Sequence, residues 1–151
     1  MKFLTTRFRS LVCLFLCTML CIVSAAAVSS RSVGGDTTIT VDGVTYVFRG
    51  HINYSAEDGS IFFGASVNSS KLMPANRFGI SLTAYNTDND EIVSTVVVYN
   101  TADNRSITIT PSKKVTTPGV YYCIPRLYVV SASGVRTSYE GIATPRLRYP
   151  R

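Results

Sequence analysis

One histidine and one cysteine are the residues best suited to covalent chemistry. A histidine can convert a nearby cysteine into a thiolate nucleophile, so His51 and Cys123 could serve a hydrolase or thiol enzyme if the fold joined them. Cys123 lies within the apolar stretch Tyr121–Ile124, however, where a small thiol packs as an apolar side chain. No local signature of a known thiol enzyme surrounds it. A buried, unreactive cysteine is the favoured interpretation, and a His51/Cys123 enzyme is the alternative.

Acidic residues suggest two further kinds of site. Asp88, Asp90 and Glu91 resemble the first half of a calcium loop, but the glycine and distal glutamate of such a loop are missing. A turn whose side chains bond to their own backbone is the favoured explanation. Glycoside hydrolysis needs two carboxylates facing one cleft, and most acids here lie in turn sequences. Zinc needs several His or Cys ligands. The sequence therefore predicts no catalytic residues, no metal ion and no cofactor.

The C-terminal part of the chain combines tyrosines with arginines. Residues 120–151 contain five Arg and five Tyr but one acid, Glu140, whereas residues 28–119 contain eight acids and seven bases. A segregated positive field attracts anionic polymers, and tyrosine rings can add stacking contacts. Solubilising groups on solvent-facing strands are the alternative. The predicted binding residues, for contact with an anionic cell-wall or surface polymer, are Arg126, Tyr128, Arg136, Tyr139, Arg146, Arg148 and Tyr149.

The first 27 residues have the order of a secretory signal peptide. Lys2, Arg7 and Arg9 precede an apolar run at residues 11–23, and the small residues 24–27 follow it. We expect the run to be helical, but it is shorter than the roughly 20 residues that a membrane span requires. The sequence therefore predicts cleavage after Ala27, secretion to the extracellular space, and no membrane span in the mature chain. Cleavage after Ala25 or Ala26, and an uncleaved N-terminal anchor, are the alternatives.

Cleavage at this position changes the cysteine and charge counts. Three of the four cysteines leave with the signal peptide, so Cys123 has no partner for an internal disulfide. A lone thiol fits a bacterial exported protein better than a disulfide-rich animal one. The mature chain holds nine Arg and three Lys against nine acids, a net charge of +3. This charge is too weak to indicate nucleic-acid binding.

The elements that would position these side chains are β strands, because apolar and polar residues alternate with period two after residue 35. Asp42-Gly43 predicts a tight hairpin turn that places Val41 opposite Val44. Residues 92–99 are apolar on both faces, which predicts a central strand. Pro125 predicts an edge or a bulge in the strand that contains it. The residues predicted to face the core include Ile39, Tyr46, Phe48, Ile61, Phe63, Ala65, Val67, Phe78, Ile80, Leu82, Ala84, Ile107 and Ile109.

Short strands joined by Gly, Asn, Asp and Pro turns predict an all-β fold. The expected architecture is an antiparallel β-sandwich, Ig-like in architecture, with about seven or eight strands. A small barrel is the alternative. The predicted organisation is a signal peptide at residues 1–27, a flexible lead-in of small polar residues at 28–35, and one β-sandwich domain at 36–151.

A resemblance to a known group rests on short stretches of the C-terminal part. These stretches resemble the C-terminal half of uncharacterised small secreted proteins of Gram-positive bacteria. The resemblance implies export and a β-rich fold, and it implies no activity. The residues that carry it are Pro118-Gly-Val-Tyr-Tyr122, Leu127-Tyr-Val-Val130, Gly134, Tyr139 and Thr144-Pro-Arg-Leu-Arg-Tyr149.

The leading functional hypothesis is a secreted, non-enzymatic binding or interaction domain. General acid–base catalysis needs positioned His, Glu, Asp or Lys side chains, and the mature chain has few that could be brought together. One alternative is a small secreted hydrolase or thiol enzyme that uses His51 and Cys123. A second alternative is a secreted antibacterial or host-directed effector.

Overall fold

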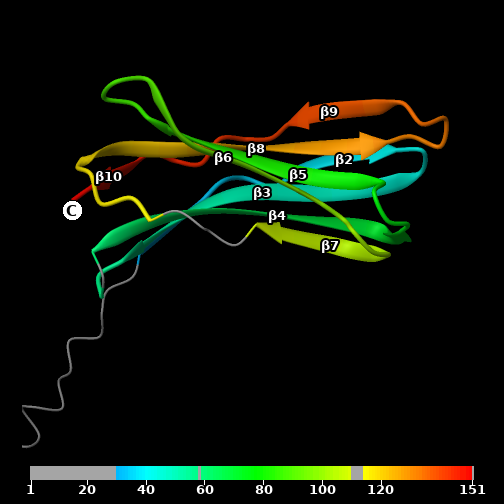
Figure 1. The fold of residues 1–151 in the computed structure, drawn as a ribbon, viewed down its shortest axis with the longest axis horizontal. Coiled ribbons are helices and arrows are strands. Elements are labelled where there is room, and N and C mark those ends of the chain that lie inside the picture. Colours follow the sequence, from blue (N-terminus) through cyan, green and yellow to red (C-terminus); the bar gives the residue numbers. More distant parts are fainter. Residues whose placement is uncertain (1–29, 58, 110–113, 151) are drawn as a thin grey trace, which may run out of the picture.

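The computed structural model describes residues 30–57, 59–109 and 114–150 (Figure 1). The predicted signal peptide and its cleavage site lie outside these residues. In the described ranges, every element of regular structure is a β strand, and the strands form two layers. A search of the same ranges finds no helix with the length and hydropathy needed to cross a membrane.

The strands form two antiparallel sheets. Strands β1 and β2 both pair with β3 in sheet A, and β4 and β7 follow. Strands β9 and β10 both pair with β8 in sheet B, and β5 and β6 follow. Sheet A contains β1 (Ser30–Val33), β2 (Thr37–Val41), β3 (Val44–Ser55), β4 (Ser60–Met73) and β7 (Asn104–Ile109). Sheet B contains β5 (Phe78–Asn86), β6 (Glu91–Tyr99), β8 (Gly119–Val130), β9 (Arg136–Glu140) and β10 (Leu147–Tyr149).

This arrangement confirms the predicted all-β antiparallel sandwich. Each sheet has four strand positions when β1 with β2, and β9 with β10, are counted as one interrupted edge strand each. The hairpin of β2 and β3 has the predicted register, with Val41 opposite Val44 and Ile39 opposite Tyr46. Asp42 and Gly43 both have positive φ, 50° and 70°, as a tight hairpin turn between twisted strands requires.

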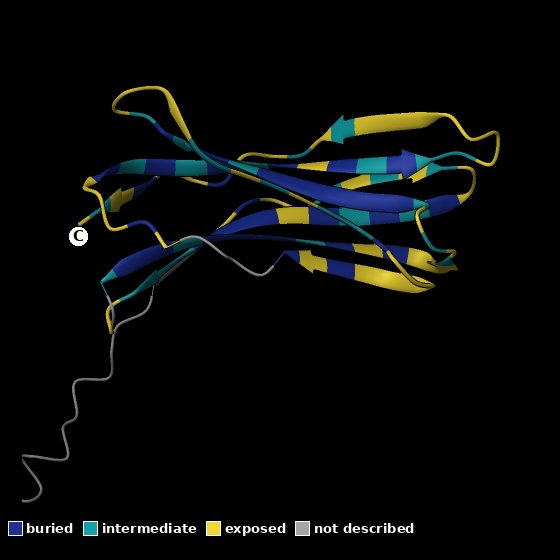
Figure 2. Ribbon diagram, viewed as in Figure 1, coloured by how far each residue is buried: buried dark blue, intermediate teal, exposed yellow. Residues whose placement is uncertain are grey.

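The core lies between the two sheets and is built by alternate residues of each long strand. Strand β8 alternates buried and partly exposed positions along its whole length, and β5 is buried at most positions (Figure 2). Such alternation sends successive side chains to opposite faces of a sheet. The largest fully buried side chains are Tyr46, Tyr121, Phe48, Phe78, Ile52, Ile61, Ile80, Ile109, Leu127, Val67, Pro125 and Cys123.

The two interrupted edge strands meet each other. Between β1 and β2, the Gly34 N–H donates to the carbonyl of Gly50 at 2.9 Å. A Cβ on Gly34 would lie 3.1 Å from the carbonyl oxygen of Ile142, in the segment between β9 and β10. The Ile142 N–H donates in turn to Oγ1 of Thr37 at 2.9 Å. One side of the sandwich is therefore closed by direct contact between the two sheets.

Two details differ from the sequence-based prediction. The predicted lead-in at residues 28–35 is paired rather than flexible from Ser30 to Val33, because these residues form β1 against His51–Tyr54. Four residues, of which only Val33 is apolar, give no periodic signal that could reveal so short a strand. Residues 92–99 form the edge strand β6 rather than a central strand, since β6 pairs with β5 alone in the described part of the chain.

Pro125 occupies the position that the sequence predicts. It faces Leu82 of β5 on one side, while its other side lies in the interruption between β9 and β10. Its carbonyl accepts the Gly141 N–H at 2.8 Å, so the backbone on that side faces a connecting segment and not a ladder. A proline nitrogen, which has no hydrogen to donate, is tolerated at such a local edge.

Candidate functional site

The outer face of sheet B is the candidate binding surface. Residues that alternate with the core-facing positions of β5, β6, β8 and β9 point away from the core on this side. Aromatic, apolar and basic side chains predominate among them. We call this surface the tyrosine face and define it by Tyr85, Tyr99, Tyr122, Tyr128, Ile92, Val97, Ile124, Arg126 and Arg136.

Arg136 lies against two neighbouring tyrosine rings on the tyrosine face. Its guanidinium carbon lies 4.9 Å from the ring centroid of Tyr99 and 4.7 Å from that of Tyr128. The two rings are 6.1 Å apart and tilted by 43°. The Tyr99 ring can lie over Gly79 of β5 because glycine has no side chain. An added Cβ at Gly79 would lie 2.4 Å from the Tyr99 ring. Cation–π contact holds the guanidinium in place without neutralising its charge.

The charge of Arg136 differs from that of its neighbour Arg126. Arg126 donates to Oε2 of Glu140 at 2.7 Å, and this pairing raises its pKa. In the described part of the chain no acidic side chain forms an ion pair with Arg136, which is exposed. Guanidinium N–H groups in a fixed orientation match the geometry of carboxylate and phosphate oxygens. Arg136 therefore offers a pre-positioned cation to an anionic ligand.

A second aromatic pair lies farther along the same face. The rings of Tyr85 on β5 and Tyr122 on β8 are stacked, with centroids 5.0 Å apart and an interplanar angle of 15°. The two residues are direct neighbours across the β5–β8 ladder. Ile92, which is 57% exposed, lies opposite Tyr85 on β6. The tyrosine face thus carries aromatic and apolar contact area at both ends, which suits a ligand that docks across the sheet.

The outer face of sheet A has a different character. Among the outward positions of the described residues of β3, β4 and β7, the aromatic rings are Phe62 and the imidazole of His51. The Lys114 ammonium nitrogen lies 5.5 Å from the centroid of the Phe62 ring. The remaining outward positions are mostly small and polar, as expected for a solvated face. They include Thr45, Val47, Arg49, Asn53, Ser66, Asn68, Ser70, Ser106 and Thr108.

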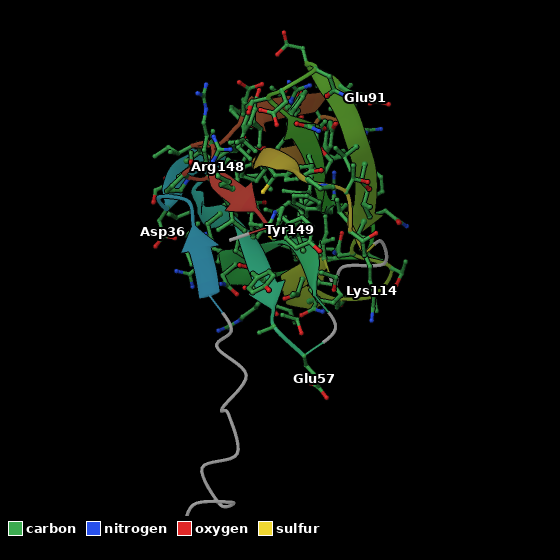
Figure 3. The ribbon with its side chains drawn as sticks, turned by 90° about the vertical axis from the view of Figure 1, so that its left-hand side faces the viewer. Asp36, Glu57, Glu91, Lys114, Arg148 and Tyr149 are labelled. Carbon is green, nitrogen blue, oxygen red and sulfur yellow. The ribbon has the colours of Figure 1, made fainter. Side chains whose placement is uncertain are left out.

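The structure brings three of the seven predicted binding residues together, namely Arg126, Tyr128 and Arg136. Arg148 lies opposite Val120 and points outward (Figure 3). Arg146 is exposed in the segment before β10. Tyr139 and Tyr149 instead pack against the core.

Both inward-facing tyrosines have clear structural roles. Tyr139 lies opposite the buried Leu127, at the edge of the core. The Tyr149 ring lies 6.0 Å from that of Tyr54, and its hydroxyl donates to the carbonyl of Gly59. These contacts join β10 of sheet B to β3 and the β3–β4 turn of sheet A. Neither residue belongs to the tyrosine face.

Sequence reasoning missed Tyr85, Tyr99 and Tyr122 as site residues, although a signal was present. Strand alternation places Phe78 through Ala84 inward at every second residue, so Tyr85 must point outward. What the pattern could not show is that β5 lies beside β8 and β6 lies beside β5. That adjacency is what brings Tyr99 to Arg136.

The side chains of His51 and Cys123 lie on opposite sides of β3. A Cβ on Gly50 would lie 3.3 Å from the Cys123 sulfur, so Gly50 faces the core and His51, the next residue, faces outward. His51 instead lies over Gly64, where an added Cβ would be 2.3 Å from Nε2 of the imidazole. Burial raises the pKa of the Cys123 thiol to about 12, which keeps it protonated at neutral pH. The geometry is that of a packed thiol, not of a nucleophile beside its base.

The acidic residues form a turn and one side of a polar pocket. Asn86 Oδ1 accepts the Asp88 N–H at 3.0 Å, and Asn89 Oδ1 accepts the Glu91 N–H at 3.3 Å, as in ordinary Asx turns. No cluster of three or more His, Cys, Asp or Glu side chains that could hold a metal ion occurs within the described ranges.

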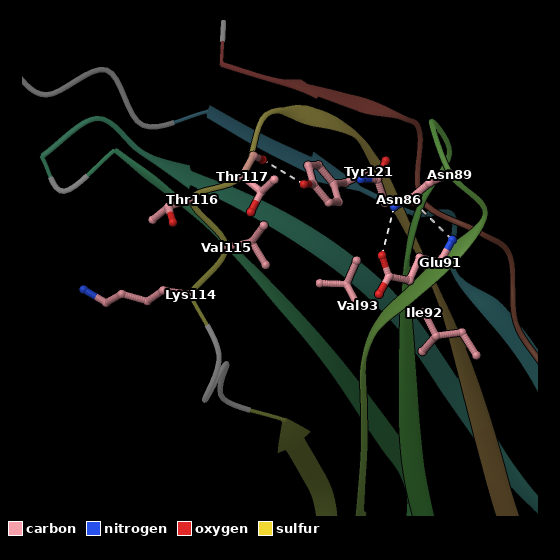
Figure 4. Close-up of a pocket in the computed structure, with 10 residues that line it drawn as sticks. All are labelled: Asn86, Asn89, Glu91, Ile92, Val93, Lys114, Val115, Thr116, Thr117 and Tyr121. Atoms are coloured by element: carbon pink, nitrogen blue, oxygen red, sulfur yellow. Dashed lines mark hydrogen bonds between the residues drawn. The ribbon is translucent and has the colours of Figure 1, made fainter.

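The pocket beside this turn has a volume of about 290 Å³ (Figure 4). Among the described residues that line it, Glu91 is the only carboxylate, and Asn89 Nδ2 donates to Glu91 Oε2 at 2.9 Å. On the opposite wall, the Tyr121 hydroxyl donates to the carbonyl of Thr117 at 2.8 Å. One carboxylate does not provide the two facing acids of a glycoside hydrolase.

Comparison with known proteins assigns no family to the chain. No family model matches the chain, and a search of curated proteins also finds no match. A search of solved structures returns a crystal structure from Bordetella pertussis that bears the name ApaA, with a TM-score of 0.38 and 12% identity. That alignment covers 83% of this chain and 96% of the other. The strand pairing of the chain itself therefore assigns the fold, an all-β antiparallel sandwich.

Proposed function

We propose that this protein is an exported, non-enzymatic binding domain that contacts an anionic cell-surface polymer through the tyrosine face. The observation that carries the proposal is Arg136, an exposed cation held by Tyr99 and Tyr128. A group that is already ordered loses little conformational entropy when a ligand docks, so more of the interaction energy appears as affinity. The outer face of sheet A offers no comparable cluster in its described residues.

Export is supported by the charged, apolar and small-residue order of residues 1–27. We expect the protein recovered from culture medium to begin between Ala26 and Ser29, as measured by intact mass. The resemblance to small secreted proteins of Gram-positive bacteria supports the same compartment. Recovery of the full 151-residue chain in the membrane fraction would contradict this part of the proposal.

Arg136→Ala is expected to weaken binding to purified Gram-positive cell walls by about tenfold, because it removes charge-assisted hydrogen bonds. Sedimentation of walls with bound protein, repeated at increasing salt, measures the effect. The matched control is Arg105→Ala, which removes the same charge from an exposed position on β7 of sheet A. The control should bind within about twofold of wild type, since a distant charge is largely screened at moderate ionic strength.

Three results would count against the proposal. Equal losses in Arg136→Ala and Arg105→Ala would mean that net charge, and not the tyrosine face, governs retention. Binding that persists on walls from which the anionic polymers have been stripped would mean that the ligand is another wall component. Absence of wild-type binding at low salt would remove the anionic polymer as the ligand.

A further inference from the structure

Strand β6 has the composition of an interior strand but lies at the edge of its sheet. Residues 92–99 contain no charge, no proline and no glycine, and six of the eight are β-branched. Such a strand is typical of the interior of a sheet. In the structure β6 ends sheet B and pairs with β5 alone among the described strands, so the backbone groups on its other side join no ladder there (Figure 3).

The other three sheet edges carry features that prevent further pairing. The β1–β2 edge is interrupted at residues 34–36, and the β9–β10 edge is interrupted at residues 141–146, which include Pro145. Strand β7 carries Arg105 and pairs with β4 in an irregular register. Interruptions, bulges, prolines and charges are the devices by which natural proteins block edge-to-edge association. On β6 a register shift occurs only near Ile92, and Ser94–Tyr99 carry none of these devices.

The open side of β6 also leaves the core incompletely covered. Val96 and Val98 point inward and pack against the core, yet both remain only partly buried. Their neighbours on β5, Leu82 and Ile80, are 3% and 0% exposed. The difference arises because β5 has a strand on each side and β6 has one. An added strand would cover the flank of Val96 and Val98 and satisfy the outward backbone groups of β6.

We infer that the strand added at this edge is β6 of a second copy of the chain, paired antiparallel across a two-fold axis. In such a pairing each residue lies near residues of the same strand, so any charge within β6 would face a like charge. The uncharged run from Ile92 to Tyr99 meets this requirement. Valine and threonine pairs are favourable across antiparallel strands. The two copies of sheet B would then form one continuous sheet.

This inference is independent of the proposed ligand and is tested by the mass of the protein in solution. Residues 28–151 contain all ten strands of the described part of the chain, and we expect this chain to sediment as a dimer. Thr95→Lys places a charge in the middle of β6 at an exposed position, where it leaves the core intact. The variant is expected to sediment as a monomer. Thr108→Lys is the matched control, because it adds the same charge at an exposed position of β7, an edge strand of sheet A. The Thr108→Lys variant should remain a dimer.

Hydrogen exchange gives a second readout that needs no variant. Backbone amides of residues 94–98 that face the open edge should become more protected as the protein concentration rises. A wild-type chain that is monomeric at all concentrations would overturn the inference. The edge of β6 would then either stay unpaired or pair with a strand of another protein. A dimer that survives Thr95→Lys in a folded protein, or unchanged exchange in residues 94–98 on dilution, would also overturn it.

Discussion

Replacing Asn100 with alanine is expected to lower the free energy of unfolding by about 2–4 kcal/mol, because it leaves the buried Phe78 N–H and a partly buried carbonyl without their partner. Asn100 is 3% exposed and follows the last residue of β6. Its Oδ1 accepts the Phe78 N–H at 3.1 Å, and its Nδ2 donates to the carbonyl of Pro74 at 2.6 Å. One side chain thus joins the end of β6 to the start of β5 and to the turn before it.

Urea denaturation followed by tyrosine fluorescence measures this loss. Asn68→Ala is the control, since Asn68 is exposed on the outer face of sheet A, and its effect should stay within about 0.5 kcal/mol. If both variants lost the same small amount, the hydrogen bonds of Asn100 would not contribute to stability as argued here.

The free energy of unfolding is expected to fall as the pH rises above 9, and Cys123 should account for a measurable share. Burial raises the pKa of this thiol from 9.0 to about 12 in the folded protein. Between these values the unfolded chain releases the proton while the folded chain retains it, so alkaline pH favours unfolding. By pH 10 the loss from this one group amounts to about 1.4 kcal/mol relative to neutral pH.

Denaturation of wild type and Cys123→Ala between pH 7 and pH 10 separates this contribution. The variant loses packing at all pH values, so the comparison rests on the slopes and not on the absolute stabilities. We expect a shallower slope in the variant. It should not be flat, because burial also raises the pKa of Tyr46 and Tyr121, and both groups keep disfavouring the folded state at alkaline pH. Identical slopes would mean that the Cys123 thiol ionises as readily in the folded protein as in the unfolded chain.

Local features of the fold could be predicted because period-two alternation and turn residues act over a few neighbours. The register of β2 against β3, the positive φ at Asp42 and Gly43, and the buried face of β5 all follow from such short-range patterns. The order of strands within each sheet does not. Residues 92–99 have the composition of an interior strand, and only the complete topology shows that they form an edge.

The candidate site was predictable in part for the same reason. The excess of Arg and Tyr after residue 120 pointed to Arg126, Tyr128 and Arg136, which share one surface. The same count included Tyr149, whose ring turns inward to Tyr54. Composition cannot distinguish the two faces of a strand. Composition also could not show that Tyr99 contacts Arg136, because that contact depends on the strand order β8-β5-β6.

The meeting of the two interrupted edges has a consequence for the order in which the chain folds. Thr37 and Ile142, which share a hydrogen bond, are separated by 105 residues, and Gly59 and Tyr149 are separated by 90. Closing such long loops costs entropy before any contact forms, and proteins rich in distant contacts fold slowly. A chain that emerges N-terminus first can assemble the hairpins of sheet A early. It cannot lock them to sheet B at this side until residues 142–149 have also emerged, so the late arrival of a short segment sets the time at which the sandwich becomes complete.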